Sequence, residues 1–163
     1  MSYDISTDGI RGDELMLFIK RGSDYLPIAY AKTHTLSLSS DSIDTSNKMD
    51  GKWKSSLAGK IGWSITSDCL ISKTTGHLSA QTLAILMAKQ EPIELAIGIP
   101  KEGLEGEKFT YDSTNTWYTG SATITSLDQK ADAGAMCESS ITLEGQGALK
   151  DSTGTALDEV VLS

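Results

Sequence analysis

Alternating apolar and polar residues predict two long strands near the C-terminal end of the chain. From Tyr118 to Ile124 every second residue is aromatic, aliphatic or glycine, and the residues between them are threonine or serine. From Cys137 to Leu143 the odd-numbered positions are small or apolar, whereas the even-numbered positions from Glu138 to Glu144 are polar or acidic. A period of two is that of a half-buried strand, and the intervening residues 128–134 have the composition of a turn. The pattern therefore predicts an antiparallel hairpin with one apolar face and one polar, acidic face.

Two strands are also predicted near the N-terminus. Residues 14–21 are apolar on both faces, which indicates a core strand covered on both sides. Residues 27–39 alternate regularly over about 43 Å, longer than most strands in a domain of this size. Lys32 and His34 interrupt the larger face of this second strand. Two interpretations stay open: the strand leaves the core and packs elsewhere, or it is bulged and the lysine extends to water.

Residues 40–60 form the longest stretch without regular alternation, and a loop of this length in a compact domain needs a reason. Lysines surround two large apolar residues here, a mixture that suits a protein interface. The alternative is a disordered surface loop with a buried tryptophan. The residues concerned are Lys48, Lys52, Lys54, Lys60, Trp53 and Leu57.

The middle of the chain predicts a strand, a helix and a further strand. Residues 62–71 and 92–100 have strand patterns, and residues 79–90 have the pattern of a helix that begins at Ser79 and ends at Glu91-Pro92. A helical stripe of large apolar residues predicts that this helix covers a face of the sheet. The stripe consists of Leu83, Leu86 and Met87.

The 163 residues suit one domain, with a polar arm at 1–13, a body at 14–150 and a tail at 151–163. No apolar run approaches the roughly 20 residues that cross a bilayer, and the first residues lack a signal-peptide pattern. We therefore expect synthesis in the cytosol and no membrane anchor.

The charge distribution disfavours tight binding of nucleic acid. The net charge is −8, and residues 108–163 carry −5 of it, whereas residues 41–60 sum to +1. Proteins that grip DNA need clustered lysine and arginine to displace counterions from phosphates. An acidic surface would instead let DNA pass without sticking, although ordinary solubility also accounts for it.

Motifs for catalysis, metals or cofactors are missing from the sequence. His34 and His77 are the two histidines, and no GxSxG, HExxH, P-loop or cysteine–histidine arrangement occurs. The aspartates at 41, 44 and 50 lack EF-hand spacing. Cys69 and Cys137 lack CxxC spacing and are expected to be small buried hydrophobes. We expect no enzyme, no catalytic residues, no metal and no cofactor.

The order of these features resembles the major tail tube proteins of bacteriophages with long non-contractile tails. The resemblance rests on YTGSATITSL and ESSITLEGQGAL in the closing hairpin, and on the DTSNK segment at 44–48 followed by Gly51 and Trp63. It implies a mainly β (α+β) fold, an antiparallel β-sandwich or partly closed barrel with one flanking α-helix and a long projecting loop. The family forms six-fold rings whose inner sheets join into one barrel, and the rings stack into a tube for genome delivery. The tube of type VI secretion has a similar architecture, and a monomeric ligand-binding or adhesion β-barrel is the competing class.

The resemblance also implies partners and contact residues. The chain would bind itself and the tail tip or initiator, tape measure and terminator proteins, in a virion tail assembled in the host cytoplasm. DNA would pass through the lumen without tight binding. The expected inter-ring contacts, on the long loop, are Asp44, Lys48, Lys52, Trp53, Lys54 and Leu57. From alternation and charge, the expected lumen residues are Thr123, Thr125, Glu138 and Glu144.

Overall fold

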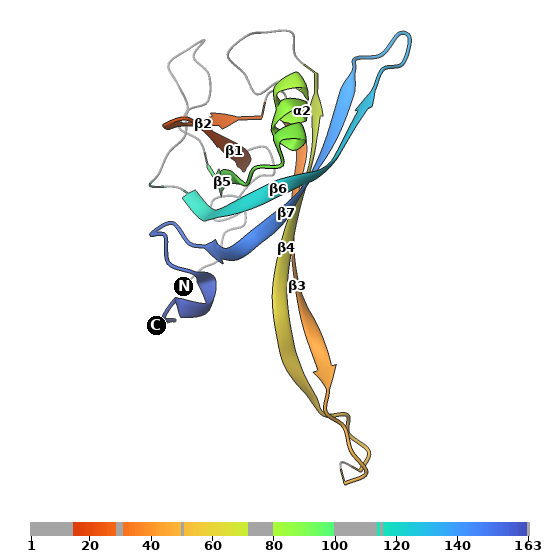
Figure 1. Ribbon diagram of the computed structural model, residues 1–163, viewed down its shortest axis with the longest axis vertical. Coiled ribbons are helices and arrows are strands. Elements are labelled where there is room, and N and C mark those ends of the chain that lie inside the picture. The colour runs from red at the N-terminus through yellow and green to blue at the C-terminus, as the bar shows by residue number, and fades with distance from the viewer. Residues whose placement is uncertain are drawn as a thin grey trace, which may run out of the picture.

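The strands form one open antiparallel sheet in the computed structural model, which describes residues 15–28, 31–49, 51–71, 80–99, 114 and 116–162. Across this sheet the described strands follow the order β2-β1-β5-β6-β7-β4-β3 (Figure 1). The elements are β1 (Met16–Arg21), β2 (Asp24–Pro27), β3 (Ala31–Asp44), β4 (Ser56–Leu70), α2 (Ala80–Lys89), β5 (Ile93–Gly98), β6 (Thr116–Lys130), β7 (Glu138–Lys150) and the 3₁₀-helix η2 (Leu157–Glu159).

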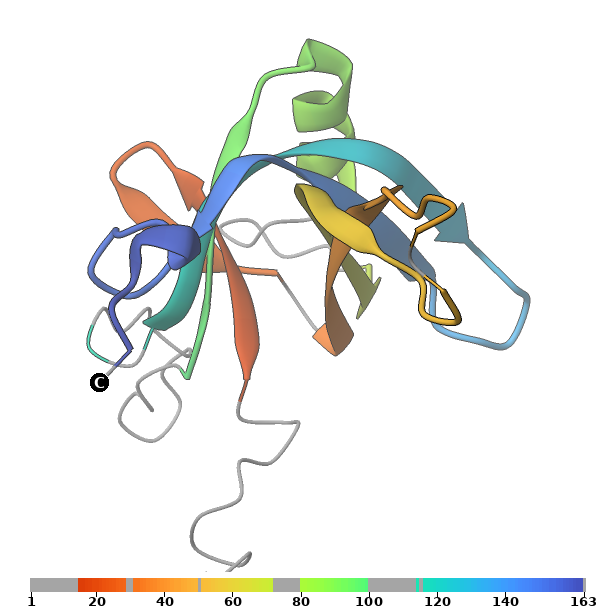
Figure 2. The same cartoon turned by 90° about the horizontal axis from the view of Figure 1, so that it is seen from below.

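The sheet is strongly curved, and two of its hairpins extend to opposite ends of the molecule. Viewed from below, β6 and β7 form an arch over the rest of the sheet (Figure 2). The β3–β4 hairpin reaches one end of the longest axis, and the turn between β6 and β7 reaches the other (Figure 1). The prediction of a mainly antiparallel β fold with one helix and a projecting segment is confirmed.

The helix and the first strand lie close to where the pattern predicts them. Leu83 of α2 is fully buried in the core, and Leu86 and Met87 pack against it, so the predicted apolar stripe is confirmed. The expected N-cap residue, Ser79, lies outside the described residues, as do His77 and the N-terminal segment 1–13. The short strand β2 was not predicted, because its four residues offer too little alternation to detect.

The prediction of an irregular loop at 40–60 is wrong over about half of its length. β3 continues to Asp44 and β4 begins at Ser56, so that only residues 45–55 connect the two strands. A register shift between Ser40 and Ser42 interrupts the alternation. Opposite this irregularity a Cβ atom on Gly59 would lie 2.9 Å from the Cβ of Asp41, which explains the glycine. Polar residues that suggest a loop are held here in a hydrogen-bonded ladder.

Both interpretations of the second predicted strand apply to β3. A register shift between Ala31 and Thr33 forms an irregularity at Lys32, as the bulge interpretation expects. β7 pairs only with the β4 segment Ser64–Leu70. From Ser56 to Trp63, β4 is therefore paired with β3 alone. The eight β4 residues from Ser56 to Trp63 span roughly 26 Å. We refer to residues 38–63, the part of the hairpin beyond the β7 pairing, as the arm.

Trp63 is packed at the point where the arm joins the body. Its indole lies against two glycines of neighbouring strands: a Cβ atom would come within 2.2 Å of the ring at Gly145 and within 2.8 Å at Gly120. The ring nitrogen Nε1 donates a hydrogen bond to the carbonyl oxygen of Gly147 at 3.0 Å. These glycines are therefore required because the aromatic ring occupies the space of a side chain.

The two cysteines have different surroundings. Cys69 is buried in the core, as expected, and burial raises the pKa of its thiol. Cys137 is exposed in the β6–β7 turn, one residue before β7 begins, so the expectation that it is buried is wrong. The alternating pattern ends where the strand ends, and nothing in the sequence marks that boundary. Both thiols are free.

Candidate functional site

A broad polar surface covers one face of four neighbouring strands, β6, β7, β4 and β3. Cross-strand partners share a face, so the register places Ser64 beside Glu144 and Ser37, and Thr66 beside Thr142 and Thr35. We call this surface the polar face. Its side chains are almost all hydroxyls and carboxylates, none of them buried. They are Thr33, Thr35, Ser37, Ser64, Thr66, Asp68, Thr123, Ser126, Asp128, Glu138, Ser140, Thr142 and Glu144.

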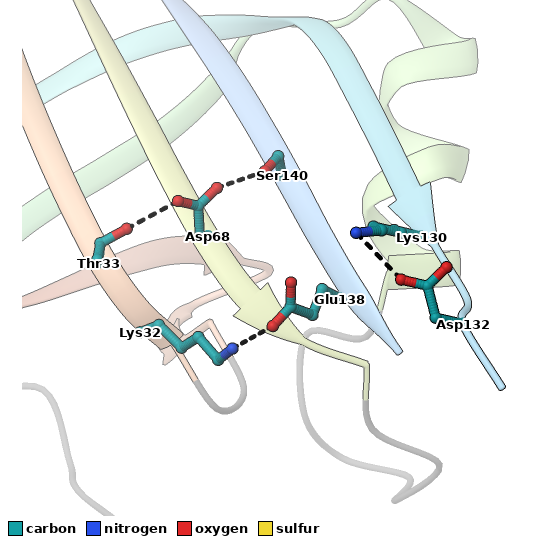
Figure 3. Close-up of polar contacts among 7 residues, drawn as sticks. All are labelled: Lys32, Thr33, Asp68, Lys130, Asp132, Glu138 and Ser140. Carbon is teal, nitrogen blue, oxygen red and sulfur yellow. Dashed lines mark hydrogen bonds and ion pairs between the residues drawn. The ribbon is translucent and has the colours of Figure 1, made fainter. Parts of the chain in front are cut away.

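Asp68 links three strands across the polar face (Figure 3). Its carboxylate accepts a hydrogen bond from the hydroxyl of Ser140 on β7 and another, at 3.0 Å, from Thr33 on β3. These hydrogen bonds, first that of Ser140 and then that of Thr33, lower the pKa of Asp68, because they stabilise its charged form. Asp68 was not among the residues predicted, although its position in an alternating strand could have indicated it.

Ion pairs balance part of the charge at the end of the polar face that lies away from the arm. Lys32 pairs with Glu138 across β3, β4 and β7, and Lys130 pairs with Asp132 at 3.0 Å (Figure 3). Each of these four side chains is about half exposed or more, so the pairs contribute little to stability. They do reduce the negative potential that the sequence alone predicts for this end.

Three of the four predicted lumen residues, Thr123, Glu138 and Glu144, lie on the polar face, and Thr125 lies at a bulge beside it. Thr123 is the cross-strand partner of Glu144. Thr125 lies at the register shift between Ile124 and Ser126, and its hydroxyl donates a hydrogen bond to the carbonyl oxygen of Thr142 at 3.3 Å. Glu138 lies at the end of β7 and is bound to Lys32. The alternation therefore predicted that Thr123, Glu138 and Glu144 share a face, whereas the bulge and the ion pair could not be read from it; the role of these residues in a lumen stays a prediction.

Among the strand edges that have no described partner, two border the polar face. β3 is an outermost strand of the sheet, so one of its edges is unpaired along its whole length. β6 pairs with β5 only as far as Ala122, which leaves the same edge of residues 123–130 without a described strand. Both edges border the polar face. Unpaired edges of this length readily bind another strand.

The tip of the arm, residues 45–55, is a closed turn. The backbone N–H of Thr45 donates to the carbonyl oxygen of Ser55 at 3.0 Å, and the Ser46 hydroxyl bonds both the N–H and the carbonyl of Ser55. Asp44 accepts from the N–H of Ser46 at 2.9 Å, and the hydrogen bonds from Ser46 lower the pKa of this carboxylate. The DTSNK segment therefore forms a hydrogen-bonded turn.

The tip presents its predicted contact residues to solvent. Trp53 is 86% exposed and Met49 is 91% exposed, so the alternative of a buried tryptophan in this turn is wrong. Lys54 lies 3.7 Å from Asp44 in an exposed ion pair. Lys48 and Lys52 are exposed and make no ion pair with the described carboxylates. Leu57, also predicted, is exposed on β4.

The sequence did not indicate how much apolar surface the arm exposes. Leu38, Ile43 and Ile61 are each more than half exposed, although a strand pattern normally implies that such residues are covered. Ile43 is the cross-strand partner of Leu57, which forms an exposed apolar pair. One feature of the sequence could have indicated these exposed apolar residues: the second predicted strand is longer than one small core can cover.

Features of an enzyme or a metal site are missing from the part of the chain that the structure describes. Within it, no group of three histidine, cysteine, aspartate or glutamate residues is placed to hold a metal ion. His34 faces the interior and its Nδ1 lies 2.8 Å from the Ser67 hydroxyl. Burial lowers the pKa of His34 to about 4, so the imidazole is neutral at physiological pH. Among the described helices none is long and apolar enough to span a membrane.

The described part of the chain is a curved open sheet with a projecting arm and one extended polar face. The chain belongs to the phage tail tube protein family, which it matches over residues 10–151. It is thus a structural, tube-forming protein of a phage tail, not the monomeric binding module that was the competing expectation. No curated protein sequence matches it at a significant level.

Solved structures of tail tubes have the same fold. The chain is 19% identical to a subunit in the tail of the empty gene transfer agent particle, which was solved with C6 symmetry, with a TM-score of 0.69. That match covers 88% of this chain and 98% of the other. The SPP1 tail tube gives a TM-score of 0.65 at 12% identity and covers 94% of this chain and 91% of the other. A chain of the anti-feeding prophage baseplate gives 0.58 at 12% identity and covers 88% and 95%.

Proposed function

We propose that this chain forms rings that stack into the tube of a phage tail, with the polar face lining the channel through which the genome passes. The observation that carries this proposal is the polar face. One side of four adjacent strands is covered with hydroxyls and carboxylates, while the other side packs into the core. A sheet with these two faces suits a wall between protein and a water-filled channel.

The unpaired edges support ring closure. The edge of β3 in one copy pairs with residues 123–130 of β6 in the next, so that the polar faces join into one continuous inner barrel. Such a head-to-tail contact closes into a ring when a whole number of copies completes one full turn. We infer six copies, the number given by the C6 symmetry of the gene transfer agent tail.

The lining that we propose includes Thr123, Thr125, Glu138 and Glu144. Glu144 supplies the clearest repulsion of DNA phosphates, because Glu138 is already balanced by Lys32. Hydroxyls provide a hydrated surface without fixed positive charge, so they do not displace the counterions bound to DNA. The channel therefore guides DNA without binding it tightly.

Assembly takes place in the host cytoplasm, and the completed tube also binds the other tail proteins at its ends. The anti-feeding prophage structures, which include a baseplate and a tube-terminating cap, are related assemblies in which similar chains occur. For this chain we propose an initiator at the tip, a tape measure protein within the lumen and a terminator at the far end.

Electron microscopy of the purified chain across a wide concentration series tests the proposal. Rings or hollow tubes are expected at high concentration, and cryo-electron microscopy of those tubes would identify the side chains that face the channel. Only monomers at every concentration, with or without tail-tip protein, would contradict the assembly. Tubes with Thr123 and Glu144 on the outer wall would contradict the lining alone.

A further inference from the structure

The two ends of the long axis carry opposite charge. The arm tip, residues 45–55, contains three lysines and one aspartate, a net charge of +2. The segment 128–138 at the other end contains two aspartates, one glutamate and one lysine, a net charge of −2. We call this segment the acidic end. The arm tip and the acidic end lie at opposite extremes of the molecule (Figure 1).

The acidic end also has a depression lined by both charged and apolar residues. A cavity of about 400 Å³ opens there, with Leu70, Ala135 and Met136 as its apolar wall. Met136 is 68% exposed. The rim consists of the two ion pairs of Figure 3, so Lys32 and Lys130 offset part of the acidic charge, and Asp128 adds a carboxylate outside these pairs.

The arm tip has the complementary features. Trp53 and Met49 expose large apolar side chains on a turn whose backbone is fixed by hydrogen bonds, so little order would be lost on binding. Exposed tryptophans surrounded by charge are typical anchors of protein contacts. Lys48 and Lys52, which have no ion-pair partner among the described residues, flank this apolar pair.

The resemblance to tail tube proteins implies that the arm tip reaches the adjacent ring, and we propose that the surface it docks on there is the acidic end of the neighbouring copy. Trp53 packs against the apolar wall of the cavity, and Lys48 and Lys52 face Asp128 and Asp132. This inference rests on the proposed stacking of rings and adds the receiving surface. The contact joins unlike ends, so it repeats from ring to ring without closing, which is the requirement for a filament.

The exposed thiol of Cys137 lies beside Met136 and gives a direct test. In tubes of the Lys52→Cys variant, mild oxidation is expected to link the introduced thiol of one copy to Cys137 of the next. Because every copy carries both thiols, the product is a ladder of linked chains on a non-reducing gel. The double variant Lys52→Cys with Cys137→Ser should give no ladder, since Cys69 is buried.

A matched control places the new thiol elsewhere on the surface. Ser23, exposed in the turn between β1 and β2, is replaced by cysteine with Cys137 kept. No ladder is expected from this variant. A ladder as strong as that of Lys52→Cys would overturn the proposal, because it would show that Cys137 reacts without docking.

Tube formation separates this inference from the proposed function. If the wild-type chain forms no tubes under any condition, the proposed function and the docking both fail. If tubes form and neither Lys52→Cys nor Trp53→Cys yields a ladder through Cys137, the docking alone is overturned.

A charge exchange provides a second readout. Lys52→Glu is expected to reduce tube length at least several-fold, and addition of Asp132→Lys is expected to restore most of it. Both side chains are exposed, so neither change should prevent folding. Failure of Asp132→Lys to restore length, with both variants folded, would count against this surface as the receiver.

Discussion

Trp53 and Trp63 lie ten residues apart on the same hairpin and have opposite surroundings. Trp63 is 5% exposed, lies against Gly120 and Gly145, and donates a hydrogen bond from its ring nitrogen to the backbone of Gly147. Trp53 is 86% exposed on the arm tip. The site of Trp63 is built by two distant strands of its own chain, whereas Trp53 has no such site among the described residues. One tryptophan therefore stabilises the fold, and the other is available to a second molecule.

The two ends of β4 differ in the same way. From Ser64 to Leu70 the strand is paired on both sides, with β3 and with β7, and its inward side chains are buried. From Ser56 to Trp63 it is paired with β3 alone. Because a two-stranded hairpin is only marginally stable by itself, the part of the arm beyond Trp63 contributes little to the stability of the isolated chain. Its exposed apolar residues are better explained by assembly than by folding.

Replacing each tryptophan by alanine should have very different effects on folding. Trp63→Ala leaves a cavity over the glycines and is expected to lower the free energy of unfolding by about 3–5 kcal/mol. Trp53→Ala, the matched control, should change it by less than about 0.5 kcal/mol, because its side chain is in solvent. Chemical denaturation of the monomer, followed by circular dichroism, measures both values. Equal losses in the two variants would contradict the comparison.

The glycines beneath Trp63 give a smaller effect. Gly145→Ala would place a methyl group 2.2 Å from the buried indole, and the ring can yield only by losing its hydrogen bond to Gly147. We expect a loss of about 3 kcal/mol, typical of an overpacked core. Gly62→Ala is the control, since its Cβ would meet only the Ser39 hydroxyl at 3.8 Å. A Gly145→Ala variant as stable as the Gly62→Ala variant would show that the indole of Trp63 can adopt another position without loss of stability.

Much of the fold could be predicted because its elements follow simple periods. The closing hairpin, the helix and the face on which Thr123 and Glu144 lie all follow from alternation or helical spacing within one segment. The packing of Trp63 could not be predicted in this way. It depends on Gly120 and Gly145, which are far away in the sequence and are brought beneath the ring only by the sheet order.

The arm was the least predictable region, for a physical reason. A side-chain pattern reports what a strand is packed against, and most of the arm, unlike Trp63 at its base, is exposed to solvent. A bulge near Asp41 shifts the alternation further. Similarly, the ion pair between Lys32 and Glu138 joins residues of two non-neighbouring strands, so the charge of the candidate lumen could not be obtained from sequence alone.

The partly buried histidine at the body end of β3, His34, predicts a pH dependence. The pKa of His34 falls from 6.5 to about 4 on burial, so between these values the unfolded chain binds more protons than the folded chain. The free energy of unfolding should therefore decrease as the pH falls from 6.5 toward 4, by up to about 3 kcal/mol.

A glutamine variant isolates this contribution of His34. Denaturant titrations at several pH values should show a weaker dependence in His34→Gln than in the wild-type chain. Carboxylates with lowered pKa, such as Asp68, are present in both proteins, so their contribution cancels in the difference. Identical slopes over this interval would mean that His34 is solvated in the folded protein.

The smallest effect on folding should accompany the largest effect on assembly. Combining Trp53→Ala with Lys48→Glu removes an exposed anchor and reverses a neighbouring charge, so the monomer should lose less than about 1 kcal/mol. Tube elongation should nevertheless stop, because the arm tip would lack both its apolar contact and its attraction to the acidic end. Ile85→Ala with Lys89→Glu makes the same kinds of change on the exposed side of α2 and should leave tube length unaltered. Electron microscopy of both folded variants measures tube length directly, and tubes of normal length from the arm variant would exclude the tip as the contact between rings.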